Sequence, residues 1–148
     1  MIALGCDHAG YPLKEAIKHY LDSIGEAYTD FGTDSEASVD YPIYAAKAAH
    51  AVADGACGCG ILCCGTGIGI SIAANKVKGI RAAVCGDAYS TEMTRMHNDA
   101  NILCMGARVI SEEKALELVQ IFLNTPALNE ERHQRRVQML KDIEYGKM

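Results

Sequence analysis

The sequence contains no tryptophan, two phenylalanines and three prolines among 148 residues. With so few large rings, the interior must be built from Ile, Leu, Val, Ala and Met side chains. The chain also lacks a basic excess, since 14 Lys and Arg face 19 Asp and Glu and give a formal net charge of −5. We therefore expect no nucleic-acid partner. Its 49% hydrophobic and 22% charged residues indicate a folded globular protein.

Linkers, repeats and low-complexity segments are absent as well, which predicts one domain over residues 1–148. We expect no secretory leader, because Asp7 interrupts the apolar run that begins at Met1. The seven cysteines are an odd number and cluster in an apolar stretch, which argues against a disulfide framework. Together these features predict a reducing, cytoplasmic location.

One uncharged run has the length of a membrane span. It covers 21 residues between Asp54 and Lys76 and contains six glycines. A spanning helix needs about 20 apolar residues, but each glycine costs about 1 kcal/mol relative to alanine in a helix. Gly65 and Gly69 have the spacing of a helix-dimer contact, yet the glycines gather around Thr66 as in a strand–loop–helix turn. We expect no membrane segment.

Short β-type runs alternate with helical patterns along the chain. The expected strands lie at residues 1–5, 26–30, 58–64, 81–85 and 102–105. The expected helices lie at residues 12–24, 41–53, a short stretch ending near 75, 90–97, 112–124 and 129–145. This alternation predicts an α/β fold: a single-domain, Rossmann-like three-layer α/β/α sandwich with a five-stranded parallel sheet and an extra C-terminal helix.

Ligands of such folds bind beyond the carboxyl ends of the strands. Here those ends carry Asp7 and His8, the glycine-rich turn at residues 64–67, and Asp87. We expect these polar groups to gather at one edge of the sheet.

The sequence CGTGIG at residues 64–69 is the strongest local signal. It is not a dinucleotide fingerprint, which would need glycine at Ile70, and no Gly-Lys-Ser/Thr follows to make a P-loop. What remains is a glycine turn at a helix N-terminus, whose N–H groups are free to bind an anion or a developing oxyanion. The alternative is a tight turn that binds nothing.

Cys64 lies at this turn, where the partial positive charge of the helix N-terminus favours a thiolate. A thiolate here suits a general base or a nucleophile. Five other cysteines are expected to be small buried hydrophobic residues: Cys57, Cys59, Cys63, Cys85 and Cys104. A zinc site is not expected, because strand alternation sends Cys63 and Cys64 to opposite faces and the paired CxxC spacing is missing.

Two of the five histidines are placed for proton transfer or anion contact: His8 at a strand end, and His97 in the polar sequence before the fifth strand. His19 and His50 fall in mid-helix and are expected to be surface or packing residues.

The last helix carries Arg132 and Arg136, which are four residues apart and share one helix face. Arg108, just after the fifth strand, is a candidate to join them. A focused basic spot on an acidic protein suits a small anion such as a phosphate ester. A solvated helix with chance arginines is the alternative.

Several motifs together resemble ribose-5-phosphate isomerase type B, within a wider group that includes galactose-6-phosphate isomerase subunits. They are GCDHAG at 5–10, DYP at 40–42, CCGTGIGISIAANK at 63–76, HNDANILCMGARV at 97–109 and RHQRR at 132–136. The resemblance covers nearly the whole chain in order. Relatives without a Cys before GTG use a Glu inside the loop as base; this loop has no carboxylate, so Cys64 is its only candidate.

The resemblance implies interconversion of ribose 5-phosphate and ribulose 5-phosphate without metal or cofactor. It also implies a homodimer, or a tetramer, whose active sites are shared between subunits. Cys64 corresponds to the base that moves the proton between C1 and C2, while Asp7 and His97 correspond to the groups that open the furanose ring. The remaining correspondences are Thr66 and the amides of Gly65, Gly67, Ile68 and Gly69 for the enediolate, Tyr41 and Asn98 for the pocket wall, and His8, Arg108, Arg132 and Arg136 for the phosphate.

Three rival functions stay open at this point. A hexose-6-phosphate isomerase, acting on allose or galactose 6-phosphate, differs only in pocket depth. A non-catalytic phosphosugar-binding module would use the glycine loop and arginines but would not need Cys64 or Asp7. A cysteine hydrolase would need a His/Cys pair and an acyl site.

Overall fold

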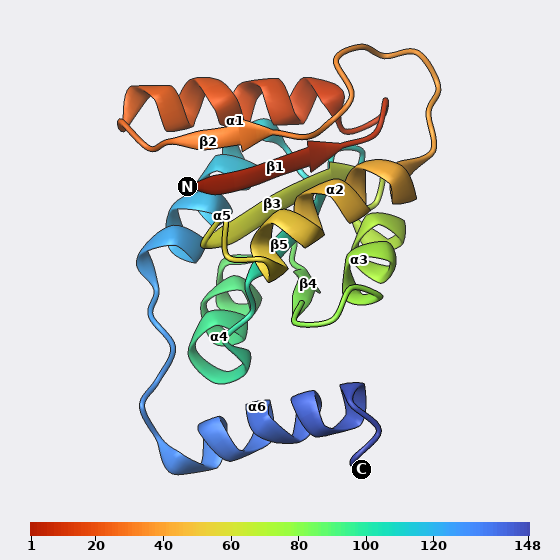
Figure 1. Ribbon diagram of the computed structural model, residues 1–148. Coiled ribbons are helices and arrows are strands. Elements are labelled where there is room, and N and C mark those ends of the chain that lie inside the picture. Colours follow the sequence, from red (N-terminus) through yellow and green to blue (C-terminus); the bar gives the residue numbers. More distant parts are fainter.

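Five parallel strands form the centre of the molecule in the order β2-β1-β3-β5-β4 (Figure 1). The computed structural model describes residues 1–148. The strands are β1 (Ile2–Cys6), β2 (Tyr28–Asp30), β3 (Cys59–Cys64), β4 (Ala82–Val84) and β5 (Ile102–Gly106). The helices are α1 (Tyr11–Ser23), α2 (Tyr41–Ala53), α3 (Ile68–Asn75), α4 (Ala88–Asn98), α5 (Glu112–Asn124) and α6 (Glu131–Glu144). The expected Rossmann-like sandwich with an extra C-terminal helix is confirmed.

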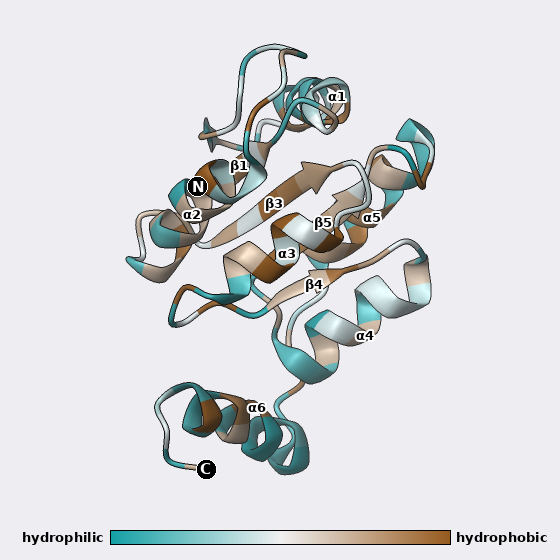
Figure 2. Cartoon of the chain, turned by 90° about the vertical axis from the view of Figure 1, so that its right-hand side faces the viewer, coloured by the Kyte–Doolittle hydropathy of each residue, from teal (hydrophilic) through white to brown (hydrophobic).

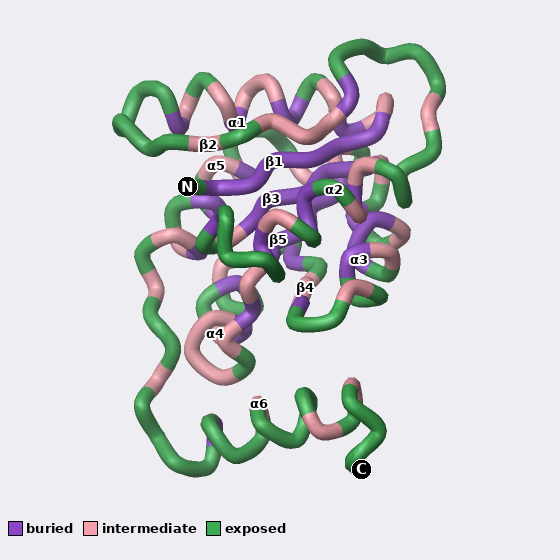
Figure 3. The backbone as a smooth tube through the Cα atoms, in the orientation of Figure 1, coloured by how far each residue is buried: buried purple, intermediate pink, exposed green.

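Side-chain alternation along β3 divides the core between the two faces of the sheet. Ile61 and Cys63 pack with α1 and α5, whereas Leu62 and Cys64 pack with α2 and α3. Every residue of β1 and β5 is buried, and so is β3 from Gly60 onward, while α6 is largely exposed and packs on α4 (Figure 3). Cys63 and Cys64 thus lie on opposite faces, as alternation predicts.

Several element bounds differ from those expected. β2 begins at Tyr28 rather than residue 26, and the edge strand β4 is limited to Ala82–Val84, because each forms only three register pairs with its single neighbour. α4 begins at Ala88 rather than residue 90, since the Asp87 carboxylate accepts the Ser90 N–H at 2.8 Å and caps the helix. α6 covers Glu131–Glu144 rather than 129–145.

The long uncharged run forms β3, the glycine turn and α3 in succession. None of the helices combines the length and the apolar character needed to cross a bilayer.

A buried lysine of α1 fastens the end of β2 and the loop after it to that helix. The Lys14 side chain is 2% exposed, and its Nζ lies 2.8 Å from the Asp30 carboxylate and 2.7 Å from the Thr33 carbonyl. Burial by itself would raise the pKa of Asp30, but hydrogen bonds from Lys14, the Gly32 N–H and Lys18 hold it below its ordinary value. This anchored loop continues to Val39 and Tyr41, which lie at the carboxyl edge of the sheet.

Replacing Asp30 with asparagine is expected to lower the free energy of unfolding by about 2 kcal/mol at neutral pH, because the buried Lys14 loses its nearest carboxylate. A carboxyl whose folded pKa is depressed stabilises the fold above its unfolded value of about 4 and loses that contribution as pH falls through the folded value. Urea denaturation should therefore show the difference from wild type shrinking below about pH 4. The exposed Asp34→Asn is the control; a difference independent of pH would contradict the assignment.

Candidate active site

Cys64 ends β3 at the carboxyl edge, and the chain then turns sharply into α3. Its Sγ accepts a hydrogen bond from the Gly67 N–H at 3.1 Å, which places positive partial charge beside the sulfur. Gly67 has φ of +80°, and a Cβ there would lie 2.8 Å from the Met105 carbonyl carbon. The turn therefore needs glycine both for its left-handed backbone and for its close approach to β5.

The same turn presents unpaired backbone donors. The N–H groups of Gly65, Thr66 and Gly69 have no hydrogen-bond acceptor within the chain. Thr66 is exposed, and its hydroxyl oxygen accepts the Ile68 N–H at 3.2 Å. Free N–H groups at a helix N-terminus form a site for an anion or an oxyanion.

Asp7 and His8 continue from the neighbouring strand β1. The buried Asp7 carboxylate accepts the Gly10 N–H at 3.0 Å, and its own N–H donates to the Cys63 carbonyl at 3.3 Å. His8 Nδ1 accepts the Val39 N–H at 3.2 Å, so the neutral imidazole carries its proton on Nε2. The Nε2–H is therefore free to donate to a ligand.

Tyr41, the first residue of α2, and Arg108, just after β5, complete the cluster. The Tyr41 ring packs so closely on Gly69 that a Cβ there would lie 2.9 Å from its Cζ atom. The Arg108 N–H donates to the Gly65 carbonyl at 3.0 Å, and its guanidinium lies beside Gly65. One edge of the sheet thus collects a thiol, a carboxylate, an imidazole, a phenol and a guanidinium.

The other cysteines contribute nothing to this cluster. Burial raises the pKa of Cys6 to about 11, despite the nearby Lys14 ammonium, and raises the pKa of Cys63 and Cys104. Across the chain, no group of three His, Cys, Asp or Glu side chains is arranged to hold a metal ion.

A second cluster lies where the end of α4 meets α6. The His97 ring stacks on the His133 ring with centroids 4.2 Å apart and planes 7° from parallel. Arg132 pairs with Glu130 at 3.2 Å, whereas Arg136 is exposed and forms no ion pair within the chain. A cavity of about 290 Å³ between the two helices is lined by both histidines. This cluster is cationic and open to solvent.

Burial and the positive charges around it lower the pKa of His133. The neighbours that lower it are His97, Arg132 and Arg136, and Glu130 opposes them. His133 is therefore predominantly neutral near pH 7, and its ring forms a flat support for His97.

The two clusters lie at opposite edges of the sheet. The Asn101 carbonyl accepts the N–H of Gly60 at the beginning of β3, while Cys64 ends the same strand. Four residue steps of about 3.3 Å, from Gly60 to Cys64, separate these edges by about 13 Å. One chain therefore brings Asp7, His8, Tyr41, Cys64 and Arg108 together but leaves His97, Asn98, Arg132 and Arg136 elsewhere.

Sequence reasoning gave His133 no role, although it lies inside the RHQRR motif between the two arginines. Its position in that motif was the available signal. His19 and His50 are exposed, as expected.

The chain is similar to known sugar-phosphate isomerases. A model of the family described as Ribose/Galactose Isomerase matches residues 2–140. Ribose-5-phosphate isomerase B of Escherichia coli (strain K12) is 48% identical over 143 residues, which is 97% of this chain and 95% of that protein. The structure of Clostridium thermocellum ribose-5-phosphate isomerase B matches with a TM-score of 0.96 at 48% identity and covers 99% of each chain. A D-erythrulose-4-phosphate isomerase of Pectobacterium atrosepticum is 46% identical over 124 residues, 83% of this chain and 82% of that protein.

Proposed function

The chain belongs to the ribose/galactose isomerase family, and from this premise we propose that it interconverts ribose 5-phosphate and ribulose 5-phosphate. The observation that carries the proposal is the Cys64 thiol, which accepts the Gly67 N–H beside three backbone donors that have no acceptor in the chain. An aldose–ketose isomerase that works by proton transfer needs such a base next to an oxyanion site.

Cys64 is the proposed base. Its thiolate takes the proton from C2 of the open-chain aldose, the C–H electron pair forms the C1–C2 double bond, and negative charge moves onto the C1 oxygen. The N–H groups of Gly65, Thr66 and Gly69 are the donors for that oxygen. The sulfur then returns its proton to C1, and the hydroxyl proton of O2 passes to O1 to leave the ketose. The Thr66 hydroxyl lies in the same turn and can relay this last proton.

Ribose 5-phosphate is a furanose in solution, so its ring must open first. We assign this step to Asp7 and His97, with Tyr41 and Asn98 as pocket walls. The phosphate is assigned to His8, through its free Nε2–H, and to Arg108, Arg132 and Arg136.

These roles require residues from both clusters in one site. Because the two clusters lie at opposite edges of one chain, a second copy of the chain would supply one of them. Apolar side chains are exposed on adjoining elements: Ile43 on α2, Ile68 and Ile72 on α3, and Val84 on β4. Figure 2 shows apolar residues on the outward side of α3. Exposed patches of this kind mark interfaces. They support a homodimer in which the Cys64 cluster of one copy faces the His97 cluster of the other, either alone or within a tetramer.

The seven cysteines are all free thiols, which supports a reducing, cytoplasmic location.

The substrate is tested by measuring turnover of ribose 5-phosphate beside allose 6-phosphate, galactose 6-phosphate and erythrose 4-phosphate, each with and without EDTA. We expect EDTA-insensitive turnover that is fastest on the pentose. Turnover of a hexose or tetrose phosphate alone would keep the chemistry and change the substrate. No turnover of any of them would leave a phosphosugar-binding module.

Replacing Arg132 or Arg136 with alanine is expected to raise KM for ribose 5-phosphate about tenfold or more and to change kcat little, because a charge-assisted hydrogen bond to the phosphate is lost. The matched control is Arg135→Ala, whose guanidinium pairs with Glu131 at 2.6 Å on the same helix. Initial-rate kinetics measure both constants. An unchanged KM in both variants would show that Arg132 and Arg136 do not bind the phosphate.

A further inference from the structure

The turn that follows His97 and Asn98 has an unusual residue at its tightest point. Asp99 is the only non-glycine residue with positive φ, at φ 46° and ψ 45°. Its N–H donates to the Arg95 carbonyl, and the Ala100 N–H donates to the Thr94 carbonyl. The first of these is the bond of a helix C-terminus that closes on a left-handed residue, a position that glycine usually takes. Aspartate brings to this position a carboxylate whose contacts glycine could not make.

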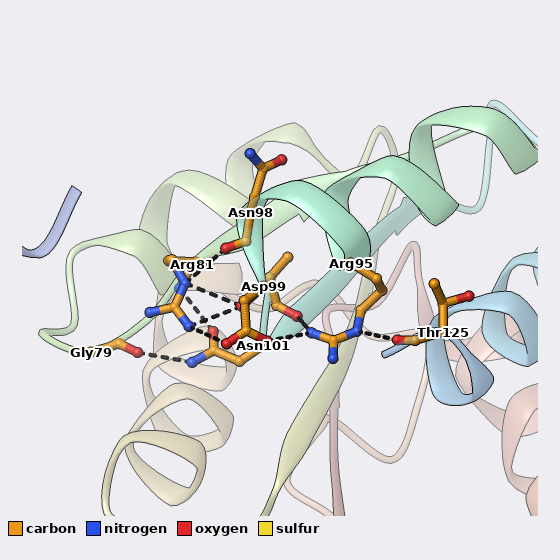
Figure 4. A network of polar contacts seen from close by, with 8 residues as sticks. Gly79, Arg81, Arg95, Asn98, Asp99, Asn101 and Thr125 are labelled. Atoms are coloured by element: carbon orange, nitrogen blue, oxygen red, sulfur yellow. Dashed lines mark hydrogen bonds and ion pairs between the residues drawn. The ribbon is translucent and has the colours of Figure 1, made fainter. Parts of the chain in front are cut away.

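That carboxylate joins two arginines from different elements (Figure 4). Arg81 Nη2 lies 3.4 Å from Asp99 Oδ2, and Arg95 Nη1 lies 3.0 Å from Asp99 Oδ1. Without Asp99, the two guanidinium groups that its carboxylate joins would have no negative charge between them and would repel.

The same guanidinium groups hold the backbone of the turn. Arg81 Nε donates to the carbonyls of Asn98 and Asp99, both at 3.1 Å, and its Nη2 donates to the Asp99 carbonyl at 2.9 Å. Arg95 donates to the Ala100 carbonyl at 2.6 Å and to the Thr125 carbonyl at 3.0 Å. The peptide groups directly after His97 are therefore tied to the residue that precedes β4 and to the end of α5.

Asn101 completes the attachment. Its Oδ1 accepts the Arg81 N–H at 2.8 Å, and its Nδ2 donates to the Gly79 carbonyl at 2.8 Å. Arg95 also lies over the Phe122 ring of α5, 5.5 Å from its centroid. The end of α4 is held by groups on three other segments, although the side chains of His97 and Asn98 stay accessible.

We propose that Asp99, Arg81 and Arg95 are positioning residues that fix the end of α4, so that His97 and Asn98 meet the substrate in the geometry that ring opening requires. The proposal rests on the function assigned above. It separates two parts of the reaction, since these three residues act through His97, which is assigned to ring opening, and not through the Cys64 thiol. Loss of the network should impair ring opening and leave proton transfer at the thiol intact.

Two substrates distinguish ring opening from proton transfer. Ribose 5-phosphate must be opened before it reacts, whereas ribulose 5-phosphate is acyclic because its 5-hydroxyl carries the phosphate. Deuterium entry at C1 of ribulose 5-phosphate in D2O therefore reports the Cys64 step alone. Conversion of ribose 5-phosphate reports ring opening as well.

The variants are Asp99→Ala and Arg81→Lys, with Arg135→Ala as the control arginine. We expect kcat for ribose 5-phosphate to fall about 10- to 100-fold in both, as for a catalytic group displaced by about 1 Å, while C1 exchange of ribulose 5-phosphate stays within about threefold of wild type. Asp99→Asn keeps the left-handed turn and one hydrogen-bonding oxygen, so it should lie between wild type and Asp99→Ala. If Asp99→Ala does not fold, the activity of Asp99→Asn tests the proposal instead.

NMR contacts between the His97 and His133 rings give a readout that needs no substrate. They should weaken in Asp99→Ala and persist in Arg135→Ala. Unchanged ring contacts with wild-type conversion would overturn the proposal, and so would a parallel loss of conversion and exchange. If the wild-type protein neither converts nor exchanges these sugars, the assigned function fails, and the ring contacts still decide whether the network positions His97.

Discussion

Replacing Cys64 with alanine is expected to lower kcat for ribose 5-phosphate about 10³- to 10⁴-fold, since a general base in the transition state contributes on that order. Deuterium exchange at C1 of ribulose 5-phosphate should disappear with it. Binding of a phosphate ligand should change little, because the proposed role of the sulfur is at the reacting carbons and not at the phosphate. Initial rates, exchange by NMR and ligand titration measure the three quantities.

Cys63→Ala is the matched control. Cys63 is the adjacent residue, but it packs in the core on the opposite face of the sheet, where burial raises the pKa of its thiol. Its loss should cost some stability and leave turnover near wild type. Near-wild-type turnover in Cys64→Ala would show that Cys64 is not the base.

The second large effect is expected for His97→Ala. Conversion of ribose 5-phosphate should fall about 10²- to 10³-fold, because ring opening loses its acid–base group. Exchange at C1 of ribulose 5-phosphate should persist, because that substrate has no ring to open. The two assays are run on the same preparation, with the exposed His50→Ala as control.

A His97→Ala protein that loses exchange as completely as Cys64→Ala would place His97 in the proton-transfer step. If His97→Ala loses neither conversion nor exchange, His97 is not part of the active site.

The sequence contained most of the information needed for the fold and for one half of the site. Alternating short apolar runs and helical patterns specify a parallel sheet, and Pro42 at the first turn allowed α2 to be placed at its observed bounds. Strand alternation correctly sent Cys63 and Cys64 to different faces. The glycines around Thr66 indicated the turn, since only glycine tolerates the backbone at Gly67.

Long-range geometry could not be read in the same way. His97 and Arg108 are eleven positions apart, 108 − 97, yet β5 runs between them and carries them to opposite edges of the sheet. The Asp99 network could not be predicted from the sequence either. It depends on Arg81, which lies just before β4, and on a left-handed backbone at Asp99, a conformation that glycine usually takes. The sequence makes Arg108 a candidate to join Arg132 and Arg136, but within one chain the direction of β5 places them at opposite edges of the sheet.

The central claim is that each active site combines Cys64 of one copy with His97 of another. Its most direct test is to refold Cys64→Ala and His97→Ala proteins together and measure conversion of ribose 5-phosphate. Each protein alone should be nearly inactive. Half of randomly paired dimers would hold both variants, with one intact site of the two, so the mixture should recover about one quarter of wild-type activity. A mixture no more active than its separate components would contradict a shared site.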